Sequence, residues 1–306
     1  MFRPLIIAAS LLSLLACGSL LFVQNGAAQQ STSAQNNNAP ASNANTSTRQ
    51  NNSNSSAQRP NENNNPSARN ATAEQVAEYA VFIYGTRPGL KQIRSKGVEH
   101  GRNIRTGSDG RTEESIYDRR FIRGERTEQD RIRLDQKTPT LEYSLIYGSG
   151  KLWGLINGAT FTPRHETTVD FLSDMWHGID ALLRYKENGS KLNLVGREKR
   201  QGIDLYMLDV TDTQNRKTRF YVSSRTWRVL WLEYEEPATE GGPVVKYQRR
   251  FYDYRYAQGT LVPFRSVLYE DGHQTQENNI MTVTYGVRLE NSLFENPENS
   301  TTASQP

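Results

Sequence analysis

The sequence has almost no thiol chemistry. Of its 306 residues only Cys17 is a cysteine, and it lies inside an apolar N-terminal run. A single thiol cannot form an intramolecular disulfide, and it cannot supply the several thiolates of a cysteine-based zinc site. The stability of the folded part is therefore expected to come from an ordinary packed core.

Reactive signatures are also missing from the sequence. The four histidines stand in no HExxH spacing, and no GxSxG stretch marks a nucleophile elbow. Gly148-Ser149-Gly150-Lys151 lacks the earlier glycine and the following Ser or Thr of a phosphate loop, which favours a hairpin turn. The acidic pairs Glu113-Glu114 and Glu235-Glu236 fit solvated faces. We therefore expect no catalytic residues, no metal and no cofactor.

The N-terminal segment has the order of a secretory signal peptide. Arg3 precedes an apolar run from Leu5 to Val23, and Gly26-Ala27-Ala28 offers a cleavage site before Gln29. Two alternatives remain open. The run approaches the roughly 20 residues that span a bilayer, so it also fits an uncleaved anchor. Leu14-Leu15-Ala16-Cys17 also resembles a lipobox, in which Cys17 is acylated. All three routes place the rest of the chain outside the cytoplasm.

Composition divides the remaining chain into three parts. After a signal peptide or anchor at 1–28, residues 29–71 are almost wholly Gln, Asn, Ser, Thr and Ala. This stretch is too polar to bury a core, so we expect a disordered linker. Residues 72–298 have a globular composition and the length of one domain. Residues 299–306 are polar again and are predicted to be a disordered tail.

Positive charge is concentrated in one part of the globular region. The chain has a net charge of +4, and six arginines lie between Arg119 and Arg133. Acidic residues interleave with them and aromatics are sparse, so nucleic acid is not expected as a partner. Outward-facing strand charge explains the run, and anionic lipid head groups are the alternative ligand.

The globular part begins with a predicted helix and continues mainly in strands. Thr72 and Gln75 have capping-box spacing, and Gly85 ends the helix. Alternating apolar residues then predict strands over about 98–156, followed later by a long antiparallel meander over about 203–289. The predicted fold class is therefore α+β, mostly antiparallel β.

A second amphipathic helix interrupts the strands within residues 166–189. Its apolar stripe consists of Leu172, Trp176, Ile179 and Leu183. Its opposite, polar face carries Asp170, Ser173, Asp174, His177, Asp180 and Arg184. Thr167 and Asp170 have capping-box spacing, and Gly178 lowers the helix stability by roughly 1 kcal/mol relative to alanine. The pattern predicts one amphipathic helix inserted in the middle of a sheet protein.

This order of elements resembles the LolA-like proteins, the periplasmic outer-membrane lipoprotein-sorting group. The resemblance rests on Phe220-Tyr221-Val222, Phe251-Tyr252-Asp253-Tyr254-Arg255, Pro263-Phe264 and Ser292-Leu293-Phe294, and it covers most of residues 72–298. It implies an unclosed β-barrel wrapped over a few helices, with an apolar cavity between them. It also implies the periplasm of a Gram-negative-type bacterium.

The function that the resemblance implies is a non-catalytic carrier for the acyl chains of a lipid or acylated lipoprotein. The alternative is an envelope sensor or scaffold that binds the membrane surface or a membrane protein. The second helix suits a movable cover with Trp176, Ile179 and Leu183 as lipid contacts, and Trp231 and Phe264 are candidates for the facing wall. A fixed core helix explains the same stripe.

The first prediction concerns processing. The polar step after Val23 predicts a mature protein that begins near Gln29. Intact-mass measurement on protein isolated from its native envelope checks this. A diacyl adduct on Cys17, or a mass that retains residues 1–28, would contradict it.

Overall fold

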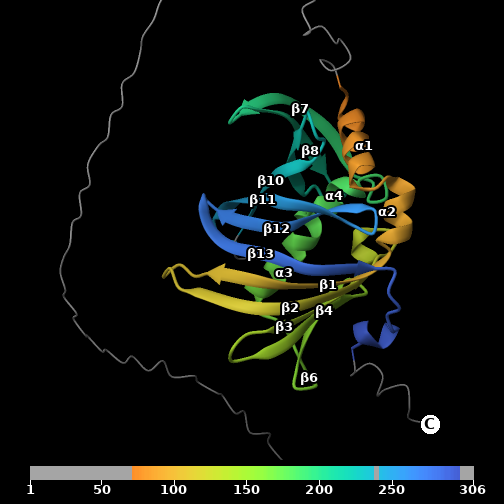
Figure 1. Cartoon of the computed structure of the whole chain (residues 1–306). Helices are drawn as coiled ribbons and strands as arrows, with labels where there is room; N and C mark the ends of the chain where they lie inside the picture. The colour runs from red at the N-terminus through yellow and green to blue at the C-terminus, as the bar shows by residue number, and fades with distance from the viewer. Residues whose placement is uncertain (1–70, 238–240, 297–306) are drawn as a thin grey trace, which may run out of the picture. The chain divides into compact units, whose positions relative to one another are not determined.

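The computed structural model describes residues 71–237 and 241–296, shown in colour in Figure 1. The predicted signal peptide, nearly all of the linker and the C-terminal tail lie outside these residues. The helices are α1 (Ala73–Tyr84), α2 (Arg87–Ile93), α3 (His165–His177) and α4 (Ile179–Leu183), with 3-10 turns η2 (Thr127–Gln129) and η3 (Asn291–Phe294). Within the described ranges no helix has both the length and the apolarity to cross a bilayer.

The strands follow one another along the chain with few interruptions. They are β1 (Lys96–Thr106), β2 (Thr112–Ile122), β3 (Arg131–Lys137), β4 (Glu142–Gly148), β5 (Lys151–Ile156), β6 (Ala159–Phe161), β7 (Lys191–Arg200), β8 (Ile203–Thr211), β9 (Lys217–Ser223), β10 (Val229–Pro237), β11 (Val244–Ala257), β12 (Thr260–Glu270) and β13 (His273–Tyr285). All join a single sheet in the order β6-β5-β4-β3-β2-β1-β13-β12-β11-β10-β9-β8-β7. The pairings within it are antiparallel.

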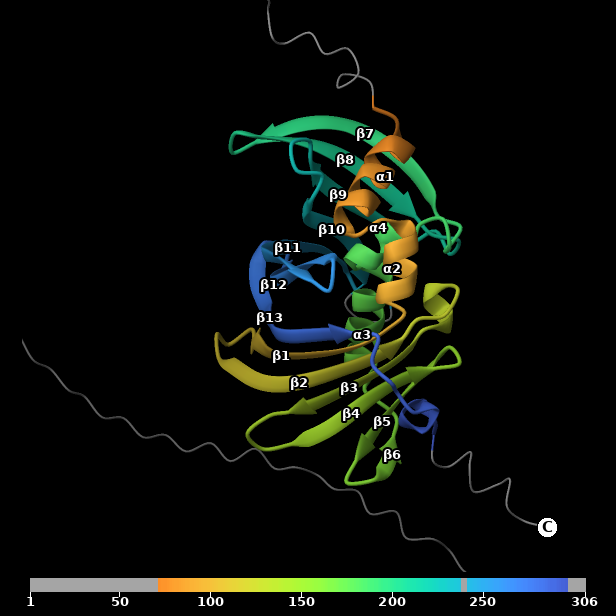
Figure 2. The same ribbon diagram turned by 45° about the vertical axis from the view of Figure 1, so that its right-hand side comes forward.

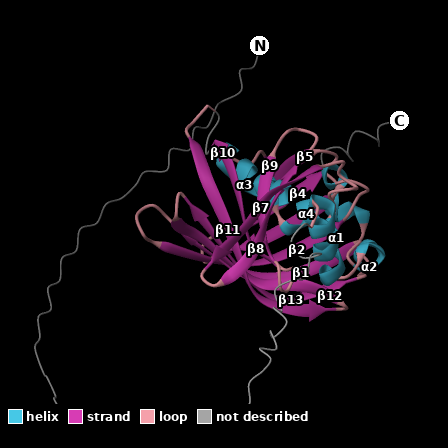
Figure 3. Ribbon diagram, turned by 90° about the horizontal axis from the view of Figure 1, so that it is seen from above, coloured by secondary structure: helices cyan, strands magenta, loops and turns pink. Residues whose placement is uncertain are grey.

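The sheet is long, curved and open. Its two edges, β6 and β7, stand at opposite ends of the strand order and do not pair with each other. Figures 1 and 2 show the strands fanning from β7 to β6 past the helices, and Figure 3 shows the same curvature from above. The predicted fold class is confirmed: an α+β chain dominated by an unclosed antiparallel barrel over a few helices.

Helix α1 begins where the sequence predicts. Thr72 Oγ1 accepts from the Gln75 backbone N–H at 3.2 Å, and Gln75 Oε1 accepts from the Thr72 N–H at 2.8 Å, which completes the capping box. Gly85 forms the C-cap with φ 137°, a conformation that strains any residue with a Cβ. The helix packs into a core cluster with α4 and the inner face of β8 to β11.

A second core cluster surrounds α3. It joins side chains of β2, β3, β4 and β12, among them Phe121, Ile132, Tyr147, Val262 and Phe264. The two clusters are distinct groups of packed residues, one around α1 and α4 and one around α3. The inner face of the sheet is therefore covered by helices at two places.

The second predicted helix is divided into two. Helix α3 ends at His177, Gly178 has an extended backbone with ψ 174°, and α4 starts at Ile179. The predicted capping box of Thr167 and Asp170 is wrong, because α3 already begins at His165. The extended conformation at Gly178 cannot continue the i→i+4 hydrogen bonds, so α4 leaves α3 in a new direction.

Candidate functional site: a cavity between α3 and the sheet

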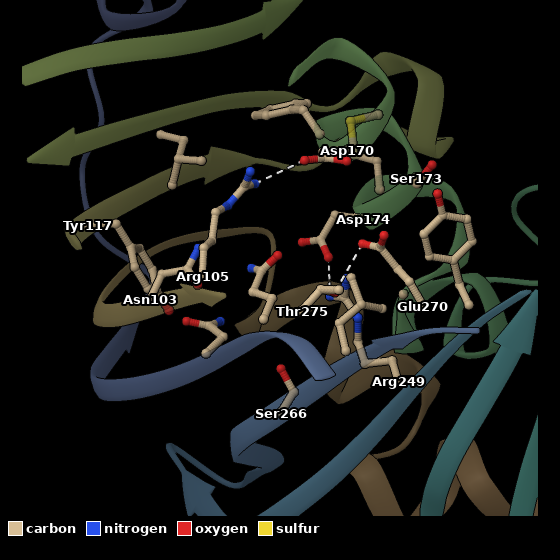
Figure 4. A pocket seen from close by; sticks show the side chains of 18 of the residues that line it. Asn103, Arg105, Tyr117, Asp170, Ser173, Asp174, Arg249, Ser266, Glu270 and Thr275 are labelled. Atoms are coloured by element: carbon tan, nitrogen blue, oxygen red, sulfur yellow. Dashed lines mark hydrogen bonds and ion pairs between the residues drawn. The ribbon is translucent and has the colours of Figure 1, made fainter. Parts of the chain in front are cut away.

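A cavity of about 1280 Å³ lies between the α3–α4 pair and the inner face of the sheet. Its walls come from β1 to β4 on one side, from β10 to β13 on another, and from α3 and the start of α4. The β1–β2 and β12–β13 turns stand at its rim. Figure 4 shows polar side chains projecting into this space from both the helix and the strands.

One wall of the cavity is apolar. On β3 and β4, Leu134 and Leu145 are paired across the strands and line the space beside Ile132. On the helices, Phe171, Met175 and Ile179 line it at i, i+4 and i+8 positions. These side chains form an apolar surface on which a hydrocarbon chain can be buried.

The remaining walls carry charge, because α3 turns its acidic side chains toward the sheet. Asp170 pairs with Arg105 of β1 at 3.1 Å, and Asp174 pairs with Arg249 of β11. Both links appear as dashed lines in Figure 4. The polar face of this helix is therefore turned toward the sheet, where Asp170 and Asp174 stay about half exposed, and the expectation of an apolar cavity is wrong for these walls. Arginines on distant strands supply partners that draw the acidic face inward.

The last turn of α3 is fixed by a buried hydrogen-bond network. His177 is only 2% exposed; its Nδ1 lies 2.6 Å from Thr218 Oγ1 and its Nε2 lies 2.8 Å from Glu236 Oε1. Ser173 donates to the other oxygen of Glu236, and the imidazole stacks on Tyr234 with ring centroids 4.0 Å apart. Burial raises the pKa of Glu236, but the hydrogen bonds from His177 and Ser173 outweigh it and lower the pKa below its ordinary value.

Helix α4 is held by a cluster of arginines and carboxylates. Asp180 pairs with Arg123 and lies 3.7 Å from Arg94. Burial raises the pKa of Asp180, but the two guanidinium groups outweigh it and hold the pKa well below its ordinary value. Nearby, Arg184 pairs with Asp130 at 2.7 Å, and both side chains are almost fully buried. This cluster joins α4 to the ends of β1, β2 and β3.

The five residues predicted to contact lipid are dispersed. Ile179 lines the cavity, whereas Leu183 is 2% exposed within the core cluster around α1 and α4. Trp176 is on another side of α3, where the Arg216 guanidinium lies 4.0 Å from its ring centroid. The structure does not bring these three side chains together on one wall.

The two candidates for the facing wall are also apart. Trp231 stacks on Tyr221 at 4.6 Å, on the sheet face opposite the buried Leu232 and Phe220. Phe264 is buried in the core cluster around α3. Lipid contact by all five residues stays a prediction. The cavity-facing residues Phe171 and Met175 were missed because they lie beside, and not on, the strongest apolar stripe.

Half of the arginine run, three of the six residues, is paired with acids. Arg120 and Arg133 both bind Asp135, and Arg123 is buried against Asp180. Free outward-facing charge therefore describes only part of the run. The expectation of a solvated Glu235-Glu236 pair is likewise wrong for Glu236, which binds His177. Guanidinium groups that already hold carboxylates have less capacity for anionic head groups.

Comparison with solved structures identifies the architecture. A LolA superfamily protein from Nitrosomonas europaea matches with a TM-score of 0.52 at 11% identity, covering 75% of this chain and 100% of that chain. The chain has a LolA-like fold.

Two further structures support that conclusion. A DUF1329 family protein from Desulfovibrio piger gives a TM-score of 0.54 at 13% identity and covers 75% of this chain and 99% of its own. A domain named for outer membrane lipoprotein sorting, from Vibrio parahaemolyticus, gives 0.51 at 14%, covering 74% and 98%. No protein-family model and no curated protein sequence matches the chain. The likeness to these solved structures is therefore one of fold, at 11–14% sequence identity.

The LolA-like domain offers no arrangement typical of a metal site. In the parts of the chain that the structure describes, no group of three or more His, Cys, Asp or Glu side chains is placed to hold a metal ion. Several of its carboxylates are instead engaged in ion pairs with arginines, among them Asp170, Asp174 and Asp180.

The Asp180 cluster yields a pH-dependent prediction. Because the folded state lowers the pKa of Asp180, its contribution to stability is present above the unfolded carboxyl pKa of about 3.9. That contribution is lost as the pH falls through the folded pKa. Asp180→Asn leaves Arg123 without its partner and should lower the free energy of unfolding on the order of 3 kcal/mol at pH 7.

Urea unfolding of wild type and Asp180→Asn at pH 7, 5, 4 and 3 measures this effect. We expect the gap in unfolding free energy to be nearly constant at pH 7 and 5, and to narrow below pH 4. Asp253→Asn, which alters an exposed pair with Arg255, serves as the control. A gap that widens toward acid pH would contradict the assignment.

Proposed function

We propose that the LolA-like domain is a non-catalytic binding protein for acylated amphiphiles, which holds the acyl chain against the apolar wall of its cavity. The observation that carries the proposal is the composition of that cavity. Leu134 and Leu145 of the sheet and Phe171, Met175 and Ile179 of the helices line one space. Polar side chains, among them the ion-paired Asp170 and Asp174, line other parts of it, as suits an amphipathic ligand.

The size of the cavity supports this ligand class. Its volume of about 1280 Å³ exceeds the range of roughly 300–1,000 Å³ that suits most small ligands. Each buried methylene contributes about 0.8 kcal/mol, so a chain of ~15 methylenes has a gross driving force of about 12 kcal/mol. Part of this is offset by ordering the chain and by desolvation of polar neighbours.

The compartment and partners belong to the same proposal. The N-terminal segment fits export, and the neighbour from Vibrio parahaemolyticus is named for lipoprotein sorting. We infer a periplasmic protein of a Gram-negative-type bacterium whose ligand is a lipid or an acylated lipoprotein. Fold alone does not decide function, so the ligand must be tested directly.

Chain-length dependence tests acyl binding. Saturated fatty acids of 8, 10, 12 and 14 carbons are titrated against the protein, each below its critical micelle concentration. We expect the affinity to rise about fourfold for each added methylene, as burial of about 0.8 kcal/mol requires. An affinity that does not depend on chain length, or no binding at all, would contradict the proposal and favour a sensor or scaffold role.

A matched pair of variants tests whether the acyl chain binds in the cavity. Leu134→Gln puts a carboxamide into the apolar wall and should weaken binding of the 12-carbon acid about tenfold. Leu141→Gln makes the same change at a side chain that is 45% exposed, and should leave the affinity unchanged. Equal effects of the two variants would mean that the chain binds elsewhere.

A further inference from the structure

Two carboxamides on the sheet wall of the cavity have hydrogen-bonding capacity that the protein does not use. Asn103 of β1 and Asn278 of β13 both line the cavity and lie opposite each other in the strand register. The Oδ1 atom of each is buried and has no hydrogen-bond partner. Asn103 as a whole is only 6% exposed. A buried acceptor without a donor costs about 1–3 kcal/mol, so two neighbouring ones form an unusual feature.

The surrounding side chains hold this pair in place. Asn278 hydrogen-bonds to the Tyr117 hydroxyl, and that hydroxyl donates to Glu99 Oε1 at 2.6 Å. The side-chain NH2 group of Asn278 is thus already engaged as a donor, while its Oδ1 atom has no donor. Ser266 of β12 stands opposite Asn278 on the other side and also lines the cavity. The row Asn103–Asn278–Ser266 is therefore an uncharged polar strip across three adjacent strands, labelled in part in Figure 4.

The charge of the cavity limits what this strip can recognise. Of the described residues that line the cavity, nine are acidic and five are arginines. Arg105 and Arg249, on either side of the strip, are already paired with Asp170 and Asp174. An anionic head group would meet an excess of carboxylates and few unengaged guanidinium groups. A ligand group that brings hydrogen-bond donors without negative charge suits the space better.

We propose, on the basis of the acyl-binding function above, that Asn103 and Asn278 form a head-group subsite for an uncharged, hydroxyl-rich group such as the sugar of a glycolipid. Both Oδ1 atoms are screened from solvent, so neighbouring side chains must move aside when the ligand enters; the hydroxyls then donate to the two Oδ1 atoms, and Ser266 contributes a further donor or acceptor. The acyl chain of the same ligand lies on the apolar wall formed by Leu134, Met175 and their neighbours. The subsite selects the head group, whereas the apolar wall supplies most of the affinity.

Two probes with the same 12-carbon chain test the subsite. Dodecyl maltoside carries an uncharged sugar head, and dodecanoate carries a carboxylate. Calorimetric titration below the critical micelle concentration, at pH 7.5, gives both affinities for each protein. We expect wild type to bind the maltoside at least about tenfold more tightly than dodecanoate. Asn103→Leu and Asn278→Leu should each lower that ratio about tenfold, since each removes one hydrogen bond to the sugar.

Asn279→Leu is the matched control. Asn279 neighbours Asn278 on β13, points to the other sheet face and donates to Glu277 Oε1 at 3.0 Å. This variant should leave the ratio unchanged. The ratio is measured on one sample of each variant, so a partly unfolded sample does not alter it. Thermal unfolding confirms that each sample contains folded protein.

The outcomes separate the subsite from the acyl-binding function. If both probes bind but the ratio is the same in wild type and in the Asn103 and Asn278 variants, water satisfies the two acceptors and the subsite is refuted, while acyl binding stands. Tighter binding of dodecanoate than of the maltoside also refutes the subsite. If neither probe binds wild type, both the subsite and the acyl-binding function are refuted.

Discussion

The inward-facing charge of α3 and α4 is the interaction on which the cavity depends. Asp170 and Asp174 leave α3 toward the sheet and meet Arg105 of β1 and Arg249 of β11, and Asp180 of α4 meets Arg123, which directly follows β2. Arg123 and Asp180 are mostly buried, and buried charges are stable only when they are paired, so this contact fixes α4 against the ends of the strands. The carboxylates of the two α3 pairs are about half exposed, and these pairs place charged groups on the wall of the cavity.

The same interactions give the cavity both an apolar and a polar surface. Phe171, Met175 and Ile179 alternate on the helices with the paired acids, so one ligand meets hydrocarbon on one side and polar groups on the other. The contacts that hold α3 to the sheet differ in strength between its two ends. The Asp170–Arg105 pair at its N-terminal half is about half exposed, whereas His177 at its last turn is buried in a network with Thr218 and Glu236. Exposed pairs contribute little, so the rim end of α3 is its more weakly held end.

Much of the fold is predictable from local sequence, because capping and alternation are local effects. The capping box at Thr72, the hairpin around Ser149 and the meander all lie where the sequence predicts. The site is less predictable. Helical spacing predicts that Asp174 and His177 share the polar face of one helix, but it does not predict which groups they meet. Their partners, Arg249 and Glu236, lie 75 and 59 positions away in the sequence, and local patterns contain no information about such pairings.

The central claim is that an acyl chain is buried in the cavity beside α3, and methionine methyl groups report on it directly. Met175 lines the cavity, Met207 pairs with Tyr221 on the sheet, and Met281 is 57% exposed. A fatty acid with a nitroxide near its chain end is added to protein labelled with ¹³C at the methionine methyls. We expect selective broadening of the Met175 signal. Broadening of Met207 or Met281 with Met175 unaffected, under conditions where the acid binds, would contradict it.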